Sequence, residues 1–224
     1  MSAAVVTSSS GAASAAEVIQ SHGWWLASRA SGLVALVLVT ISVFLGLAMA
    51  GKVMRRPGLS MKLLAVHEQT ALAGLVAIAV HGIALLGDPW LHPGVAGVAV
   101  PFALGFKTAF TGLGVIGSYL AALLGLSYYV RRRIGAKLWR KAHRATIVVW
   151  LLGLVHALGA GSDASAVWFR WWVLLTTPVI GGLFVYRVIA ARAKKQARAA
   201  RQRPQRALPA ERRSNVPTPV LEEA

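Results

Sequence analysis

Cysteine is absent from this sequence, and acidic residues are scarce: seven Asp and Glu stand against 24 Lys and Arg in 224 residues. The absence of cysteine excludes disulfides, thiol-ligated zinc, iron–sulfur clusters and thiol catalysis. Charged residues make up only 14% of the chain, against roughly 25% in ordinary soluble domains. Hydrophobic residues make up 56%. This composition favours a protein whose main solvent is a lipid bilayer.

The net charge of +17 is of the size that raises the question of nucleic-acid binding. The basic residues, however, lie between long apolar runs instead of along one polar face. A bilayer explains that placement better than a phosphate backbone does. We therefore expect lipid, and no nucleic acid, as the surroundings of this chain.

Five segments are apolar and long enough to cross a hydrocarbon core of about 30 Å, which takes about 20 helical residues. Backbone groups in lipid must pair internally, so these segments should be helices. The predicted spans are 30–50, 61–86, 106–130, 142–160 and 168–190. The sequence thus predicts an all-α membrane protein, a five-helix transmembrane bundle of the inner or plasma membrane.

The two ends of the chain differ from the middle. Residues 1–22 hold no Lys or Arg, so they lack the basic region of a secretory signal and are expected to form a disordered tail. Residues 191–224 are rich in charge and proline and are expected to form a disordered basic cytoplasmic tail. The transmembrane domain is accordingly assigned to residues 23–190.

The basic residues predict the orientation of the bundle. The links between the first and second spans and between the third and fourth, together with the C-terminal segment, carry 21 of the 24 Lys and Arg. Only Arg29, Lys107 and Arg170 lie towards the other side. The positive-inside rule then places the N-terminus outside and the C-terminus in the cytoplasm.

Four of the six histidines fall inside the second and fourth spans: His67, His81, His143 and His156. Both spans run in the same direction, so equal progress along each means equal depth. At about 1.5 Å per residue, the two histidines of each span are separated by about 20 Å along the helix axis. His67 should therefore lie level with His143, and His81 level with His156.

Two depth-matched pairs of histidines on parallel helices favour two haem sites. Neutral imidazole is a good axial ligand of haem iron, and helix bundles commonly hold cofactors between facing side chains. Zinc or copper would need ligands that converge on one point. The alternative is a haem-free scaffold or transporter in which the histidines bridge helices by hydrogen bonds or relay protons.

The spacing within the fourth span does not suit a regular helix. Fourteen residues from His67 to His81 return to within about 40° of the starting face, whereas thirteen residues from His143 to His156 fall about 140° short. A tight turn at His143, or a distortion at Gly153, would absorb the difference.

Other residues are candidates to support bound haem. Arg29 and Lys107 lie near the outer level and Arg144 near the inner level, where a cation would pair with a haem propionate or, alternatively, extend to lipid phosphate. Trp150 follows His143 by seven residues, within about 20° of its face. It is expected either between the two haems or as a packing residue.

The paired histidines, the run LWRKAHR at Leu138–Arg144 and the run HALGAGSD at His156–Asp163 resemble the ferric reductase-like transmembrane domain family. The family includes the membrane cores of NADPH oxidases and the haem subunit of bacterial methionine sulfoxide reductase systems. The resemblance extends over about 24–184. It implies two b-type haems, the inner held by His67 and His143 and the outer by His81 and His156.

The resemblance also implies transmembrane electron transfer, from a cytoplasmic or quinol donor to an acceptor on the outer face. Larger relatives carry a flavin and nicotinamide domain after the last helix, but the segment after Ala190 shows no Gly-rich dinucleotide fingerprint. We expect no flavin or nicotinamide site here, and a separate donor, either a flavin reductase or quinol. The acceptor stays open between ferric iron, oxygen and a partner protein. The kind of protein also stays open between an oxidoreductase, an electron-transfer subunit and a cytochrome b-type quinol oxidoreductase subunit.

Overall fold

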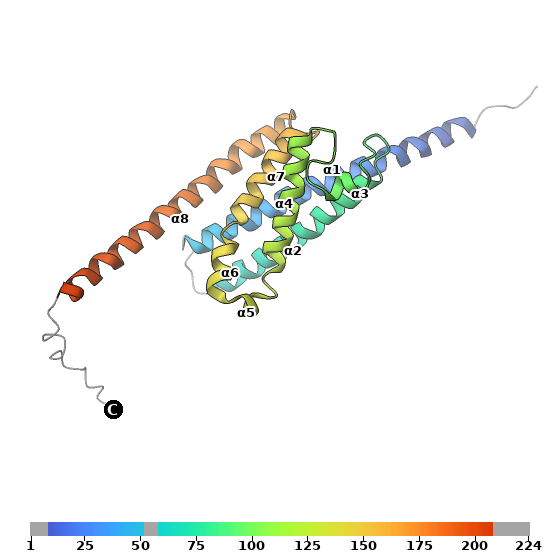
Figure 1. Ribbon diagram of the computed structural model, residues 1–224. Helices are drawn as coiled ribbons and strands as arrows, with labels where there is room; N and C mark the ends of the chain where they lie inside the picture. Colours follow the sequence, from blue (N-terminus) through green and yellow to red (C-terminus); the bar gives the residue numbers. More distant parts are fainter. Residues whose placement is uncertain (1–8, 52–57, 208–224) are drawn as a thin grey trace, which may run out of the picture.

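The computed structural model describes residues 9–51 and 58–207, and every regular element in these ranges is an α-helix (Figure 1). Five helical stretches in these ranges are long and apolar enough to cross a membrane, the fourth being α6 and α7 together, which confirms the expected number of spans. The helical elements are α1 (Ser9–Ala50), α2 (Leu59–Leu86), α3 (Gly94–Ala99), α4 (Thr108–Leu126), α5 (Arg131–Ile134), α6 (Ala136–His143), α7 (Thr146–Ala160) and α8 (Val167–Ala207).

The first and last helices are longer than the spans expected from hydropathy. α1 begins at Ser9, and α8 continues to Ala207, so both run into segments that composition had suggested as tails. Figure 1 shows these two ends projecting from the bundle. Ala, Arg, Lys and Gln dominate 190–207 and are strong helix formers, which lets a helix continue past the apolar stretch. The rest of the expected tails, at 1–8 and 208–224, lies outside the described residues.

The bundle is held by two helix pairs, α1 against α2 and α4 against α7. α8 packs against α1 and contributes to a core that also contains residues of α7. Buried residues from α1, α7 and α8 form one core cluster, namely Val43, Leu47, Trp150, Leu154 and Ile180. A second cluster joins α4 to α7 through Ala121, Leu124 and Val149. Many other large apolar side chains are exposed, as lipid-facing positions of a membrane bundle should be.

The fourth predicted span is divided by a turn directly after His143. α6 ends at His143, residues 144 and 145 form a turn, and α7 begins at Thr146. At this turn the amides of Ala145 and Val148 bond to carbonyls three residues back, each at 2.8 Å, instead of four. Such tightening rotates the chain by more than the usual 100° per residue. The turn at His143, and not Gly153 in the middle of α7, therefore interrupts the helix between the two histidines.

The connection between α2 and α4 contains the short helix α3. Asp88 is buried, and one of its carboxylate oxygens accepts hydrogen bonds from the amides of Trp90 and Leu91 at 2.9 and 3.2 Å. Lys107 ends the connection with φ near 43°, a left-handed conformation immediately before α4. This connection closes the end of the bundle at which His81 and His156 lie.

Candidate functional site

The structure brings the four helix histidines together in the two pairs expected from their depth. The ring centroids of His67 and His143 are 6.1 Å apart, and those of His81 and His156 are 6.2 Å apart. His67 and His81 come from α2, whereas His143 ends α6 and His156 lies in α7. The break after His143 is what allows both members of the α6–α7 segment to meet a partner on α2.

Three of the four imidazoles have a defined protonation at Nδ1. Nδ1 of His67 contacts the backbone oxygen of Ser42 at 2.9 Å, and Nδ1 of His81 contacts that of Ser28 at 2.7 Å. Nδ1 of His156 contacts the backbone oxygen of Phe110 at 2.9 Å. A carbonyl oxygen only accepts hydrogen bonds, so in each case Nδ1 carries the proton and donates it. A neutral imidazole held in this way keeps the lone pair of Nε2 for a metal.

The two serines on α1 form a repeat that matches the histidines on α2. Ser28 and Ser42 are fourteen residues apart, as are His67 and His81, and the two helices run antiparallel. Both serines are buried, with 3% of the surface of Ser28 and 6% of that of Ser42 exposed. Each hydroxyl also lies 3.1 Å from the Nδ1 of its histidine. Analysis of the sequence missed these residues, although the shared spacing of fourteen would have pointed to them.

Glycines make room for the rings at three of the four histidines. A Cβ at Gly32 would come within 2.9 Å of His81, and one at Gly46 within 3.3 Å of His67. A Cβ at Gly114 of α4 would come within 2.5 Å of Nδ1 of His156. On α1 each glycine follows its serine by four residues, one turn along the same face. The repeated unit on α1 is therefore a serine whose backbone carbonyl accepts a hydrogen bond from the histidine, followed by a glycine that leaves space for the ring.

His143 differs from the other three. Its Nδ1 is buried and has no hydrogen-bond partner among the described residues. Its ring is instead stacked on Trp139, with centroids 4.9 Å apart and planes inclined by 21°. The indole Nε1 of Trp139 donates to Oγ of Ser127 at 3.1 Å, which ties the indole to the end of α4.

The separation of the paired rings would suit two imidazoles that bind one metal. Two metal–nitrogen bonds of about 2.0 Å each, plus the ring radius at either end, give an expected centroid separation of about 6.3 Å for two imidazoles on one metal. Both pairs come within a few tenths of an ångström of this value. No group of three or more His, Cys, Asp or Glu that could hold a bare ion occurs in the described part of the chain. A metal at either pair would therefore take its other ligands from outside these side chains, and a haem would supply four of them.

The cations proposed near the two levels have different surroundings. Arg29 is engaged by Asp163: its Nε donates to one carboxylate oxygen at 2.8 Å, and its Nη2 contacts the other. Lys107 is exposed and lies over the ring of Phe106 at 5.5 Å. Arg144 is exposed at the turn after His143.

A further cation, which the sequence did not single out, lies at the inner level. Arg187 of α8 is close enough for its charge to act on both His143 and Arg144.

Asp163 connects the turn between α7 and α8 to α1. The Arg29 guanidinium hydrogen-bonded to the carboxyl holds the pKa of Asp163 below its usual range. Burial of the carboxyl acts in the opposite direction and is outweighed. The ion pair thereby fixes the end of the segment that carries His156.

Trp150 is buried in the core, with only 4% of its surface exposed. Its Nε1 donates to Oγ1 of Thr40 at 3.0 Å, and it packs with Val43, Leu154 and Ile180. These contacts account for Trp150 as a packing residue between α1, α7 and α8. Its expected place between two cofactors stays a prediction.

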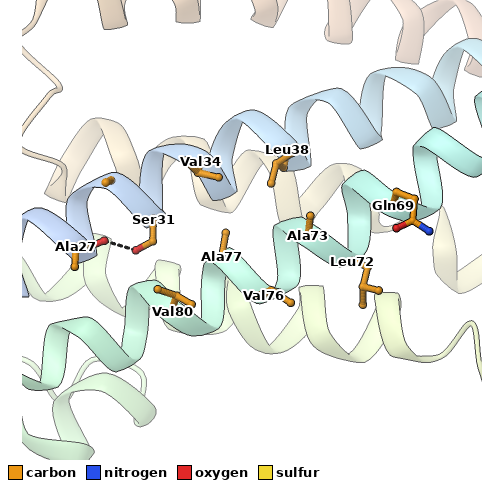
Figure 2. A pocket seen from close by; sticks show the side chains of 11 residues that line it. Ala27, Ser31, Val34, Leu38, Gln69, Leu72, Ala73, Val76, Ala77 and Val80 are labelled. Carbon is orange, nitrogen blue, oxygen red and sulfur yellow. Dashed lines mark hydrogen bonds between the residues drawn. The ribbon is translucent and has the colours of Figure 1, made fainter.

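A groove on the α1–α2 pair does not contain the histidines. It is an apolar groove of about 730 Å³ on the outer face of the α1–α2 pair, lined by residues such as Val34, Leu38, Leu72 and Val76 (Figure 2). Gln69 and Ser31 are its polar members, and the Ser31 hydroxyl donates back to the carbonyl of Ala27 at 2.6 Å. The chemistry-bearing side chains thus lie between the helices, whereas the groove faces the surroundings of the bundle.

Comparison of the sequence with known protein families gives one match. Residues 31–154 match the family described as ferric reductase like transmembrane component. No curated protein and no solved structure matches the chain. The matched segment covers more than half of the 224 residues and includes His67, His81 and His143, and it ends two residues before His156. Such domains generally bind haem and transfer electrons across membranes. This chain is a multi-pass membrane protein that belongs to the ferric reductase-like transmembrane family.

Proposed function

We propose that this protein transfers electrons across the membrane through two b-type haems, an inner one between His67 and His143 and an outer one between His81 and His156. The observation that carries the proposal is the matched separation of the two pairs, 6.1 and 6.2 Å between ring centroids. Bis-imidazole haem supplies reversible one-electron chemistry at the iron without a substrate site. The function that follows is conduction of electrons between two faces.

The residues around each pair prepare the ligands before any cofactor binds. Carbonyls of Ser28, Ser42 and Phe110 hold three rings in one tautomer and orientation. Since these acceptors belong to helix backbones, a ring that turns must break its hydrogen bond to the main chain. Fixed ligands lower the reorganisation that accompanies a change in charge at the iron.

Cations beside the two pairs are proposed to bind the haem propionates. At the inner level, Arg144 and the half-buried Arg187 lie close enough to influence each other electrostatically, which a shared anion would relieve. At the outer level, Lys107 is the better candidate because Arg29 is engaged by Asp163. Arg29 would then act by holding the α7–α8 turn in place.

The proposed direction follows from the basic residues. With the α2–α4 connection outside and the α4–α6 connection in the cytoplasm, the inner pair receives electrons and the outer pair delivers them. A separate donor, a flavin reductase or a membrane quinol, would reduce the inner haem. An acceptor on the outer face, small or protein, would be reduced by the outer one. In this proposal the chain is an oxidoreductase or electron-transfer subunit of the inner or plasma membrane.

The stoichiometry of haem tests the proposal. Purified protein should give a pyridine haemochrome ratio near two haems per chain, with low-spin spectra for both. The matched control is the chain in which all four helix histidines are replaced by Ala, which should give none. A ratio of zero in the unaltered protein would refute haem binding and favour a scaffold or transporter, and a ratio of one would refute the two-site version.

A further inference from the structure

One of the four proposed ligands is held by a different means from the other three. His67, His81 and His156 each donate Nδ1–H to a backbone carbonyl at 2.7–2.9 Å. His143 has no such acceptor, although its Nδ1 is buried. A ring that lacks this bond is free to rotate about its side-chain torsions unless packing prevents it. Something other than a hydrogen bond must therefore set the plane of the His143 ring.

Trp139 is the side chain placed to do this. It precedes His143 by four residues on α6, one turn along the same helix face. The two rings are nearly parallel, inclined by 21° with centroids 4.9 Å apart. The ring of His67 approaches His143 at 88° to its plane, so it does not stack on it. Of the two ring contacts described for His143, only the one with Trp139 covers a face of the imidazole.

The indole is itself held in place. Nε1 of Trp139 donates to Oγ of Ser127 at 3.1 Å, and Tyr128 lies against the indole with centroids 6.1 Å apart. Ser127 and Tyr128 follow the end of α4, so the contact joins two segments that the α5 turn brings together. Because α6 has only eight residues and is followed by a turn, its position depends on such contacts more than on its own length.

We propose that Trp139 is the positioning residue for His143, replacing by stacking the hydrogen bond that orients each of the other three histidines. The inference rests on the proposed haem function. The inner site is then asymmetric, because the Nδ1–H of His67 is donated to a carbonyl oxygen whereas Nδ1 of His143 has no such acceptor. A donated Nδ1–H raises the basicity of an imidazole ligand and favours ferric iron. Loss of the stack that shields His143 admits water as an acceptor and lets the ring turn.

Three variants separate stacking from mere packing. Trp139→Leu removes the stack, Trp139→Phe retains an aromatic face without the Nε1 donor, and Ser127→Ala removes only the anchor. Trp90→Leu is the matched control, because Trp90 is 75% exposed and contacts Phe106, far along the chain from the inner pair. Each variant is purified as the full chain, and haem content, the electron paramagnetic resonance spectrum of the ferric form and both midpoint potentials are measured.

We expect Trp139→Leu to shift the g values of one low-spin signal and to lower one midpoint potential, with the second haem unchanged. The shifted signal should be the one that His67→Ala abolishes. Trp139→Phe should retain most of the spectrum of the unaltered protein, and Ser127→Ala should broaden the signal that Trp139→Leu shifts. If Trp139→Leu binds two haems whose spectra and potentials match those of the Trp90→Leu control, the positioning role is refuted. If the unaltered protein binds no haem, the proposed function itself fails, which is a different result.

Discussion

The backbone oxygen of Ser42 lies 2.9 Å from Nδ1 of His67, so α1 fixes the orientation of a ring that α2 carries. The acceptor is part of the main chain, and the hydroxyl of Ser42 adds only weaker contacts at 3.1 and 3.4 Å. Ser42→Ala should therefore retain the inner haem and cost about 1 kcal/mol or less in stability. Haem titration and thermal unfolding of the variant measure both quantities. Complete loss of the inner haem would show that the hydroxyl, not the carbonyl, orients His67.

The glycines facing the rings predict a graded series of losses. Adding a methyl group should disturb haem binding most at Gly114, less at Gly32 and least at Gly46, because the new Cβ would approach the ring to 2.5, 2.9 and 3.3 Å respectively. Gly114→Ala and Gly32→Ala should affect the outer haem, and Gly46→Ala the inner one. The control is Gly181→Ala, where nothing lies within 4 Å of the added atom.

In that control, replacing a helical Gly by Ala should leave haem content unchanged and stability equal or up to about 1 kcal/mol higher. Occupancy of each site is measured from the reduced-minus-oxidised spectrum. Equal losses in all four variants would mean that the helix, and not the space beside the ring, responds to the substitution.

The two pairs should be separable by mutation. His67→Ala and His143→Ala should each empty the same site or convert it to high spin, since the macrocycle then keeps one axial bond. His81→Ala and His156→Ala should share a second phenotype, because sites about 20 Å apart act almost independently. In the outer-pair variants the inner haem should still be reduced by a donor, whereas delivery to an outer acceptor should fail. A match between His67→Ala and His156→Ala would contradict the pairing.

The ion pair between Arg29 and Asp163 predicts a pH dependence of stability. The folded protein lowers the pKa of Asp163 below its ordinary value of 3.8, so the unfolded state binds the proton more readily. The stabilisation is complete at pH values above 3.8 and is lost as the pH falls through the lower folded value. Because the Arg29 side chain is 37% exposed, the ion pair should contribute about 1 kcal/mol or less to the free energy of unfolding.

Asp163→Asn measures this contribution. The variant should melt at a lower temperature than the unaltered protein at pH 7, and the difference should shrink as the pH falls below 4. Asp88→Asn, at a buried carboxylate that accepts two backbone amides, provides a comparison that does not involve Arg29. A difference in melting temperature that is constant with pH would assign the effect to packing at the turn.

The orientation of the bundle predicts the behaviour of fused reporters. A reporter that is active only in the cytoplasm should function when fused after Ala224 and should be silent when inserted at Gly94, in the connection between α2 and α4. The prediction rests on the 21 basic residues that lie on one side against three on the other. The reverse pattern would exchange the inner and outer assignments of both haems.

Much of this protein follows from its sequence because the relevant signals are local. Apolar length fixes where a helix can cross a bilayer, and the rise per residue fixes the depth of each histidine, so the five spans and the two level pairs could be predicted without tertiary information. The ends of α1 and α8 could not be predicted this way, since Ala-rich and basic segments continue a helix beyond the apolar stretch.

The remainder depends on how the helices are rotated against one another, which hydropathy does not specify. The turn after His143 resolves the thirteen-residue spacing, and only the packed bundle shows it. Arg29 is paired with Asp163, 134 residues away in the chain, because the α7–α8 turn meets α1 in space. The serine acceptors, the glycines beside the rings and the stack of Trp139 on His143 likewise arise between segments whose relative rotation is set by side-chain packing. The sequence alone determined the membrane spans and the levels of the histidines, because these depend on length and composition. The tertiary structure decided which atoms hold each ring, because that depends on contacts between helices.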